Sequence, residues 1–331
     1  MEKNISIESY IKSGDSISLM KEIPDLSVHL IITSPPYWSA VEYQNKNYIG
    51  NGSYEKYIKD LSKIWKECER VLKPNGKLCI NSPIMPIPKK IINNHHIRHV
   101  KNINNDIEFS IIQKTNLQRF SLFIWQKQTS KLMFGSYPYP GNILEQNTIE
   151  FINVFVKEGK PEKREKKHKD LYKLTQKDWI DLTRQIWFMY PEDIFRIKNH
   201  PAPFPEKLPA RLIKLYTLGS YNDYPGDIIL DPFCGLGTVP YVAKIMNRRF
   251  IGFDISEEYI NYAKERITNS KQTEINYFVG SPKYPNKQEL NDLLIDKNDK
   301  ALALTKHKEK HKKTSYGRGF LFKKQEELIN A

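Results

Sequence analysis

The segment Leu30–Ser39 constrains the fold more than any other part of the chain. Its letters are LIITSPPYWS, an apolar run followed by two prolines and two aromatic residues. The apolar run predicts the end of a buried strand. The prolines stop the strand, because each fixes its own φ, restrains the residue before it and lacks a backbone N–H. The segment that follows is therefore stiff and offers a Ser hydroxyl, backbone carbonyls and aromatic rings.

This arrangement suits the binding of a planar base through its exocyclic amino group. Tyr37 offers a ring face for stacking, while the Ser34 hydroxyl and a carbonyl near Pro35 accept protons from the NH2 group. Two acceptors placed out of line draw the nitrogen toward tetrahedral geometry and free its lone pair for attack. The structural alternative is a strand-ending turn with Tyr37 and Trp38 packed in the core.

Composition narrows the classes of protein. The 331 residues suffice for one large domain with an insert or for two domains, and the net charge of +14 favours nucleic acid as a polyanionic partner. The sequence contains neither an apolar run of membrane-spanning length nor a signal-peptide core, so we expect no membrane association and a cytoplasmic location. Three scattered cysteines predict neither a disulfide framework nor a zinc site, and we expect no metal.

Strand and helix patterns alternate along the chain and predict an α/β sheet with parallel connections. The predicted strands cover residues 10–15, 28–32, 77–81, 120–126, 148–156, 227–232 and 250–254. The predicted helices cover residues 16–22, 54–72, 107–119, 210–218, 239–247 and 256–268. A turn is expected at residues 73–76. From residue 157 the chain becomes strongly charged, which predicts a segment outside the core.

A second constellation predicts a nucleoside-binding site. The strand DIILDP leads into the glycine-containing turn FCGLGT and a helix, and the next strand ends on Asp254. Glycines allow a close backbone approach, and an acid at the tip of the second strand can accept both ribose hydroxyls. Asp231 would repel a pyrophosphate but could face an ammonium group. This pattern favours S-adenosylmethionine over NAD or ATP; a purely structural strand–turn–helix is the alternative.

Together, TSPPYW, DPFCGLGT and FDIS resemble the motifs of exocyclic-amino DNA methyltransferases. The base-binding motif precedes the cofactor turn, which resembles the circularly permuted order of the β group. Further segments of this family are matched by HPAPFPEKLPARLI, Gly14-Asp15 and VLKPNGKLCIN. The resemblance therefore covers about residues 8–268. It implies a Rossmann-like α/β methyltransferase sheet that uses S-adenosylmethionine, with an inserted target-recognition segment.

The resemblance also implies a domain plan and residue roles. Residues 1–156 would form the catalytic half, 157–198 the target-recognition insert, 199–268 the cofactor-binding half and 269–331 an unassigned basic tail. Ser34, Pro35, Pro36 and Tyr37 would hold the base. Contacts to the cofactor are expected from Asp15, Thr33, Phe204, Pro205, Asp231, Pro232, Phe233, Gly235, Gly237, Thr238 and Asp254. The expected partners are double-stranded DNA and a companion restriction endonuclease. The expected oligomeric state is a monomer or a homodimer.

Ser34 bears on the identity of the target base. Serine in the first motif position resembles cytosine-N4 enzymes, whereas adenine-N6 enzymes more often carry Asp or Asn there, so adenine is the alternative. Cytosine-C5 chemistry is not expected, because it needs a nucleophilic thiolate and no Pro-Cys dipeptide occurs. Two other kinds of protein also fit: an RNA or protein amide methyltransferase, and a non-catalytic DNA-binding protein that retains the fold.

Two further segments are candidates for contact with DNA. The run KPEKREKKHK supplies Lys163, Arg164, Lys166 and Lys167, which either neutralise phosphates or belong to a solvated linker. Tyr137 and Tyr139 of SYPYPG either line the base pocket or pack within a loop.

Overall fold

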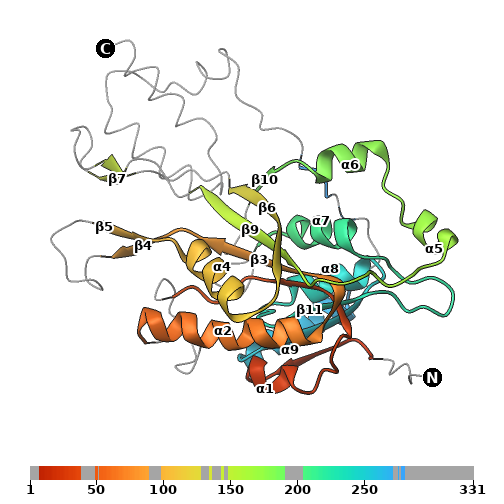
Figure 1. Ribbon diagram of the computed structural model, residues 1–331, viewed down its shortest axis with the longest axis horizontal. Helices are drawn as coiled ribbons and strands as arrows, with labels where there is room; N and C mark the ends of the chain where they lie inside the picture. Colours follow the sequence, from red (N-terminus) through yellow and green to blue (C-terminus); the bar gives the residue numbers. More distant parts are fainter. Residues whose placement is uncertain are drawn as a thin grey trace, which may run out of the picture.

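A mixed sheet of eight strands forms the centre of the described part of the chain (Figure 1). The computed structural model describes residues 7–38, 49–50, 52–88, 98–127, 134–135, 143–144, 148–190, 204–270, 275 and 277–279. In spatial order the strands are β1 (Tyr10–Ser13), β12 (Arg249–Asp254), β11 (Ile228–Asp231), β2 (Val28–Thr33), β3 (Leu72–Pro83), β9 (Ile149–Val156), β6 (Gln118–Lys127) and β10 (Ile186–Met189).

The α/β sheet predicted from the sequence is confirmed, but its strands are not all parallel. β1, β12, β11, β2 and β3 pair in parallel, whereas β9 runs antiparallel to both β3 and β6. β10 then pairs in parallel with β6. The carboxyl ends of the parallel strands and the start of β9 therefore lie at one edge of the sheet.

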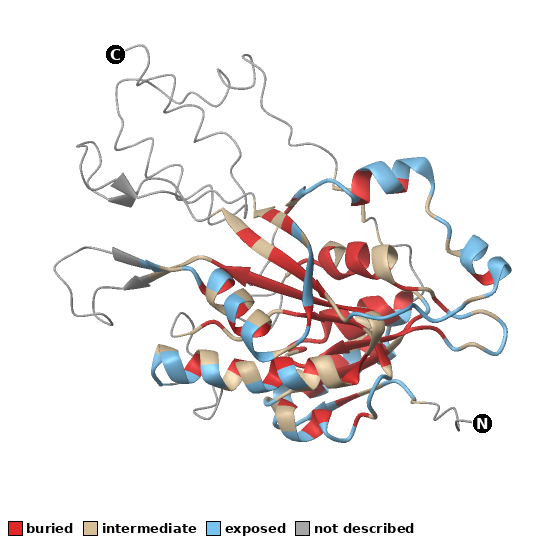
Figure 2. Ribbon diagram, viewed as in Figure 1, coloured by how far each residue is buried: buried red, intermediate tan, exposed pale blue. Residues whose placement is uncertain are grey.

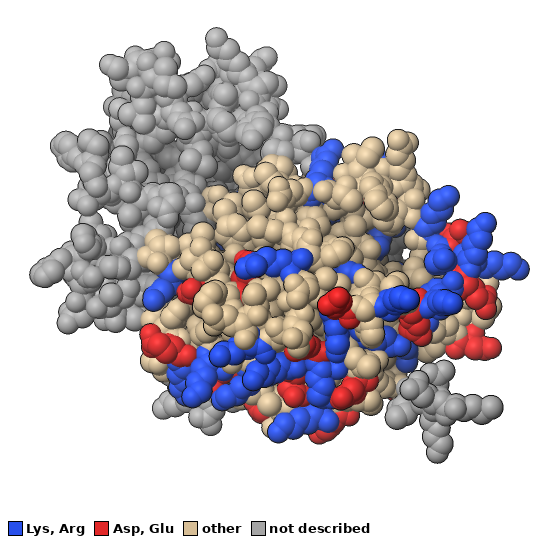
Figure 3. All heavy atoms as spheres, viewed as in Figure 1, with Lys and Arg blue, Asp and Glu red and all other residues tan. Residues whose placement is uncertain are grey.

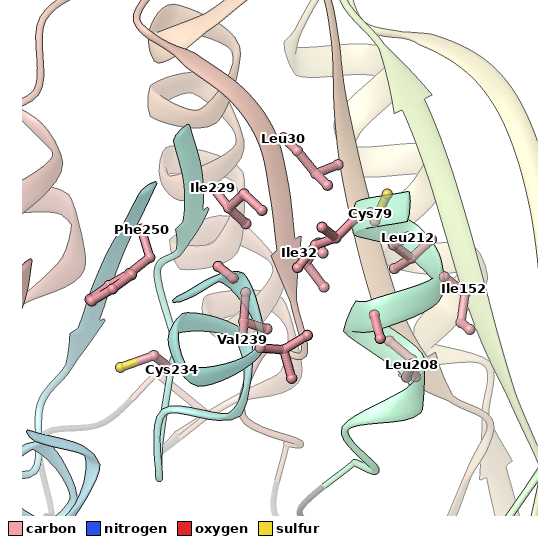
Figure 4. Close-up of a cluster of buried hydrophobic side chains, with 14 of the residues drawn as sticks. Leu30, Ile32, Cys79, Ile152, Leu208, Leu212, Ile229, Cys234, Val239 and Phe250 are labelled. Atoms are coloured by element: carbon pink, nitrogen blue, oxygen red, sulfur yellow. The ribbon is translucent and has the colours of Figure 1, made fainter. Parts of the chain in front are cut away.

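Helices cover both faces of the sheet. The helices of one face are α1 (Ser16–Met20), α2 (Tyr54–Val71) and α4 (Ile103–Lys114). Those of the other face are α7 (Lys207–Tyr216), α8 (Thr238–Ile245) and α9 (Glu257–Thr268). Successive residues of a strand point to opposite faces, so Leu30 and Ile32 join one core cluster while Ile31 joins the other. Figure 2 shows the buried strands between the helices, and Figure 4 shows one of the clusters.

Some local predictions differ from the structure. The expected turn at residues 73–76 is part of β3, where Asn75 takes a left-handed conformation (φ 64°) and its N–H donates to the Lys157 carbonyl. α4 begins and ends several residues earlier than predicted, because Asn102 caps its first turn through the N–H of Asn105. Two antiparallel pairs, β4 (Met85–Pro88) with β5 (Arg98–Lys101) and β7 (Phe134–Gly135) with β8 (Ile143–Leu144), lie in segments that carried no strand prediction.

The predicted insert at residues 157–198 is not wholly separate from the core. It contains α5 (Lys166–Leu171), α6 (Gln176–Leu182) and the edge strand β10. Trp187 of β10 is fully buried and stacks on Phe123 of β6, with ring centroids 4.4 Å apart. Arg211 of α7 donates to the Asp181 carboxylate of α6 at 2.5 Å. The strand β10, which lies within the predicted insert, therefore belongs to the main sheet.

Across the described ranges, no helix is both long enough and apolar enough to cross a membrane.

Candidate active site

The sheet brings together the segment TSPPYW, at the end of β2, and the turn FCGLGT, after β11. β2 pairs with β11 through Leu30 with Ile229 and Ile31 with Leu230, so both strands end at the same edge. There the Thr33 hydroxyl donates to Asp231 Oδ1 at 2.7 Å, across 198 residues of sequence. Ser34 follows Thr33, and the glycine-containing turn follows Asp231. The base-binding motif and the cofactor turn are therefore neighbours whatever their order along the chain.

The turn between β11 and α8 depends on two glycines. Gly235 and Gly237 have φ values of 49° and 74°, the left-handed region in which a side chain is strained. A Cβ on Gly237 would also lie 2.6 Å from the Ala263 Cβ of α9. Gly237 starts α8 without a side-chain cap. The backbone at the start of α8 therefore packs closely against α9. Because Gly237 has no side chain, none covers the backbone there.

Asp231 is almost completely buried at the start of this turn, with an exposed fraction of 1%. Its Oδ1 accepts from the Thr33 hydroxyl and from the Phe233 N–H at 3.0 Å. Burial raises the pKa of Asp231 to about 7, and the charge of Asp254 adds to this effect, although the two hydrogen bonds oppose it. Asp231 therefore changes its charge near neutral pH.

Asp254 ends β12 beside the same turn. Its Oδ2 accepts from the Gly235 N–H and its Oδ1 accepts from the Ser256 N–H, both at 2.9 Å. Burial raises the pKa of Asp254. The carboxylate thus organises the turn, and it can still accept from a further donor.

The segment after β1 reaches the same edge. Gly14 N–H donates to the Asp254 carbonyl at 2.9 Å, and the Ser16 hydroxyl donates to the Pro232 carbonyl at 2.5 Å. Asp15 is exposed between them and caps α1 by accepting from Ser18 N–H at 2.9 Å. Asp15 is therefore near the turn after β11, with a capping role that already occupies one carboxylate oxygen, and its contact with the cofactor stays a prediction.

Arg266 of α9 and Glu206, just before α7, lie beside the start of α8. Phe204 is half-buried against the core, and Pro205 is buried. Arg266 of α9 donates to the Thr238 hydroxyl at 3.2 Å and forms an ion pair with Glu206 at 2.6 Å. Sequence reasoning missed Arg266, because α9 carries both Lys264 and Arg266 and the sequence does not show which of them packs against the turn.

The base-binding motif forms a chain of hydrogen bonds. The Ser34 hydroxyl donates to the Tyr37 hydroxyl at 3.3 Å, which donates to Glu150 Oε2 at 3.0 Å. Ser34 and Pro36 are half-buried, while Pro35 and Tyr37 are buried. Trp38 instead packs edge-on against Tyr54, with ring centroids 5.0 Å apart, and donates to the Gly52 carbonyl. Trp38 thus follows the structural alternative, whereas Tyr37 joins the polar side of the site.

Sequence reasoning also missed Glu150 and its neighbours. Glu150 is 6% exposed at the start of β9 and accepts from Asn81 Nδ2 and from Lys127 Nζ at 2.7 Å. A single acid in the otherwise largely apolar strand IEFINVFV is the signal that could have indicated it.

The residues predicted to contact DNA lie in different surroundings. Arg164 is anchored within the protein, because its Nη2 donates to the Tyr224 hydroxyl at 2.7 Å and to Asp227 at 3.2 Å. These partners lie where β2 and β11 begin, and Figure 1 shows α5 away from the β4–β5 pair that follows the end of β3. Along β2 this edge is about 16 Å from Ser34, at roughly 3.3 Å per residue.

The remaining basic candidates are three exposed lysines, Lys163, Lys166 and Lys167. Figure 3 shows acidic side chains among the basic ones near α5. Contact of these lysines with DNA stays a prediction. Tyr137 and Tyr139 lie outside the described residues.

Cys234 lies in the cofactor turn but has no nucleophilic character. It is buried, and burial raises the pKa of its thiol well above the ordinary value, with Asp231 and Asp254 adding to the effect. A protonated thiol does not attack a pyrimidine ring.

Comparison with known proteins decides the family. Residues 28–265 match the DNA methylase family of N6 and N4 methyltransferases. This chain belongs to that family. It is 30% identical over 300 residues to the type II methyltransferase M.MjaI of Methanocaldococcus jannaschii, covering 81% of this chain and 93% of the relative.

Two solved structures share the fold of this DNA methyltransferase. TTHA0409 of Thermus thermophilus, solved in complex with S-adenosyl-L-methionine, superposes with a TM-score of 0.63 at 27% identity and covers 78% of this chain and 93% of its own. The cytosine-N4-specific PvuII DNA methyltransferase superposes with a TM-score of 0.57 at 21% identity and covers 81% and 89% of the two chains. The enzyme is thus a DNA methyltransferase that uses S-adenosylmethionine.

Proposed function

We propose that this enzyme methylates the exocyclic N4 of cytosine in a base flipped out of double-stranded DNA. The observation that carries the proposal is Ser34, a neutral acceptor at the end of β2, directly beside the cofactor turn at the end of β11. A serine in this position resembles cytosine-N4 enzymes. The net charge of +14 supports a DNA substrate.

The residues around the turn fit S-adenosylmethionine. Asp254 would hold the ribose, Gly235 and Gly237 permit a close backbone approach, and Phe204 and Pro205 would cover the other side. Asp231 accepts no hydrogen bond at Oδ2 from the described residues, which leaves that oxygen for a cationic group. When bound, S-adenosylmethionine supplies a methyl carbon on a positively charged sulfur.

The base-binding motif would make the amino nitrogen reactive. The Ser34 oxygen and a carbonyl near Pro35 accept the two amino protons, so the nitrogen lone pair is drawn out of the ring plane. Tyr37 would hold the base by stacking. In this proposal the amine would lie next to the methyl donor because β2 and β11 end side by side, and such positioning can contribute about 7–11 kcal/mol to lowering a barrier.

The first prediction concerns the product. We expect N4-methylcytosine to be the modified base when unmethylated, amplified DNA is incubated with the enzyme and S-adenosylmethionine. Digestion to nucleosides followed by mass spectrometry identifies it. N6-methyladenine as the main product would contradict the choice of base while leaving the class of enzyme intact.

The second prediction concerns pH. Asp231 is largely neutral below pH 7 and attracts a cation only when ionised, so the affinity for S-adenosylmethionine should rise about tenfold from pH 6 to pH 8. Binding a cation stabilises the ionised carboxylate, so binding near pH 6.5 should release protons. Calorimetry in buffers of different ionisation enthalpy measures both quantities.

Asp231→Asn is the matched control for this pH dependence. The variant keeps the size and the Thr33 contact of the side chain but carries no charge. It should bind S-adenosylmethionine more weakly than wild type at pH 8, and the part of the pH dependence due to Asp231 should be gone. An unchanged pH profile in Asp231→Asn would show that Asp231 does not face the cation.

Other substrates and settings are distinguished by direct tests. Labelled S-adenosylmethionine offered with DNA, RNA or protein separates a DNA enzyme from an RNA or protein amide methyltransferase, and tight DNA binding without turnover would indicate a non-catalytic protein. We further propose that the enzyme works in the cytoplasm within a restriction-modification system. Modified DNA should then resist a companion endonuclease that cuts the same sequence.

A further inference from the structure

A buried carboxylate terminates the hydrogen-bond chain that begins at Ser34. Glu150 accepts at Oε2 from the Tyr37 hydroxyl, at 3.0 Å, and from Asn81 Nδ2. At Oε1 it accepts from Lys127 Nζ at 2.7 Å. The Glu150 side chain is 8% exposed and that of Lys127 is 16% exposed. An ionised carboxylate surrounded by three donors acts only as an acceptor.

The Glu150 carboxylate fixes the donor and the acceptor of each hydrogen bond between Ser34, Tyr37 and Glu150. Tyr37 has one hydroxyl proton, and it goes to Glu150, so the Tyr37 oxygen can only accept from Ser34. The single proton of Ser34 is thereby used on Tyr37. What the Ser34 oxygen can still offer is lone pairs, and these are what a target amino group needs.

The fold itself does not require an ion pair at this point. Glu150 and Lys127 lie on β9 and β6, whose backbones already pair along their length, with Glu150 opposite Trp125. Burying two charges costs several kcal/mol per ion before their attraction is counted. The ion pair of Glu150 and Lys127 lies at the edge of the sheet where β2 and β3 end. We therefore look for its role in the site rather than in the stability of the sheet.

We propose that Glu150 is a positioning residue that keeps the Ser34 hydroxyl an acceptor toward the target amino group, acting through the Tyr37 hydroxyl. Lys127 and Asn81 hold the carboxylate in place, and Lys127 balances its charge. The proposal rests on the proposed function of Ser34. It explains why the motif tyrosine directs its hydroxyl into the protein interior while its ring belongs to the base-binding motif.

Glu150→Gln tests the proposal with a side chain of the same size. The carbonyl of Gln would face Lys127 and its NH2 group would face Tyr37 and Asn81, whose amide would turn its oxygen toward that NH2 group. The hydrogen-bond chain would then reverse, and Ser34 would donate toward the substrate. We expect kcat on unmethylated, amplified DNA to fall by on the order of ten- to a hundredfold. KM for DNA and the calorimetric affinity for S-adenosylmethionine should stay within about twofold of wild type.

Tyr37→Phe separates this role from a structural one. It keeps the ring but cuts the chain, so kcat should fall while KM for DNA stays near wild type. Because Glu150 acts through the hydroxyl, adding Glu150→Gln to Tyr37→Phe should change kcat less than twofold. A merely structural role would instead make the two effects multiply and would lower thermal stability in proportion. Glu67→Gln, which weakens the Glu67–Arg70 ion pair on α2, is the matched control and should retain wild-type kcat.

The outcomes distinguish this proposal from the proposed function. Wild-type kcat in Glu150→Gln, or multiplying effects in the double variant, would overturn the role of Glu150 if Ser34→Ala still loses activity. Full activity in Ser34→Ala would instead overturn the proposed function on which it rests. If Glu150→Gln fails to fold, Tyr37→Phe still decides, because wild-type kcat in that variant excludes any action through the hydroxyl.

Discussion

In a Ser34→Ala variant, kcat for DNA methylation is expected to fall by on the order of a hundredfold, with a smaller rise in KM. The Ser34 oxygen matters most when the amino lone pair forms, so its loss raises the barrier more than it weakens substrate binding. Tyr37→Ala should also lose most turnover, because base stacking contributes roughly 1–3 kcal/mol and the contact with Glu150 disappears. Steady-state kinetics with labelled S-adenosylmethionine and unmethylated, amplified DNA measures both variants.

Cofactor binding is the control for these two variants. Neither side chain is expected to contact S-adenosylmethionine, so calorimetry should give affinities near wild type. Wild-type rates in both Ser34→Ala and Tyr37→Ala would contradict the proposed mechanism, whatever base is modified. A loss of cofactor affinity equal to the loss of rate would instead indicate that the variants disturb the turn after β11.

Asp254→Ala should weaken the binding of S-adenosylmethionine at least tenfold. The carboxylate is expected to accept two ribose hydroxyls, and bonds to a charged group contribute roughly 1.5–3 kcal/mol each. The substitution also removes the acceptor for the Gly235 N–H, which shapes the turn itself. Calorimetric titration of the purified variant gives the affinity directly.

Ser256→Ala separates ribose binding from local stability. The Ser256 hydroxyl caps α9 by accepting from the Tyr259 N–H at 3.3 Å, and loss of such a cap costs about 1 kcal/mol of stability. This variant should have a lower melting temperature than wild type and an unchanged cofactor affinity. If Asp254→Ala binds the cofactor as tightly as Ser256→Ala does, the ribose assignment is wrong.

The sequence alone predicted the strands that lead into the motifs. The apolar run before Ser34 predicted β2, and the runs before Asp231 and Asp254 predicted β11 and β12 within one residue at each end. Proline and glycine act locally, on their own backbone angles and those of their neighbours. Where strands stop and turns begin can therefore be inferred from nearby residues.

Tertiary structure decided which distant residues meet. Nothing local to Thr33 specifies that its hydroxyl reaches Asp231, because the contact depends on β2 lying beside β11. The antiparallel direction of β9 depends in the same way on its partners β3 and β6, and this direction places Glu150 opposite Pro83 at the end of β3. Strand order is a property of the whole sheet.

Burial likewise changed what single charged residues can do. Arg164 stands in a basic run but donates to Tyr224 and Asp227, so it anchors its segment to the start of β11. Glu150 stands alone in a largely apolar strand but joins the Ser34–Tyr37 chain. The sequence does not show whether a charged side chain lies in water or in the protein interior. Its function depends on the donors and acceptors that the fold packs around it, and these come from segments far away in the sequence.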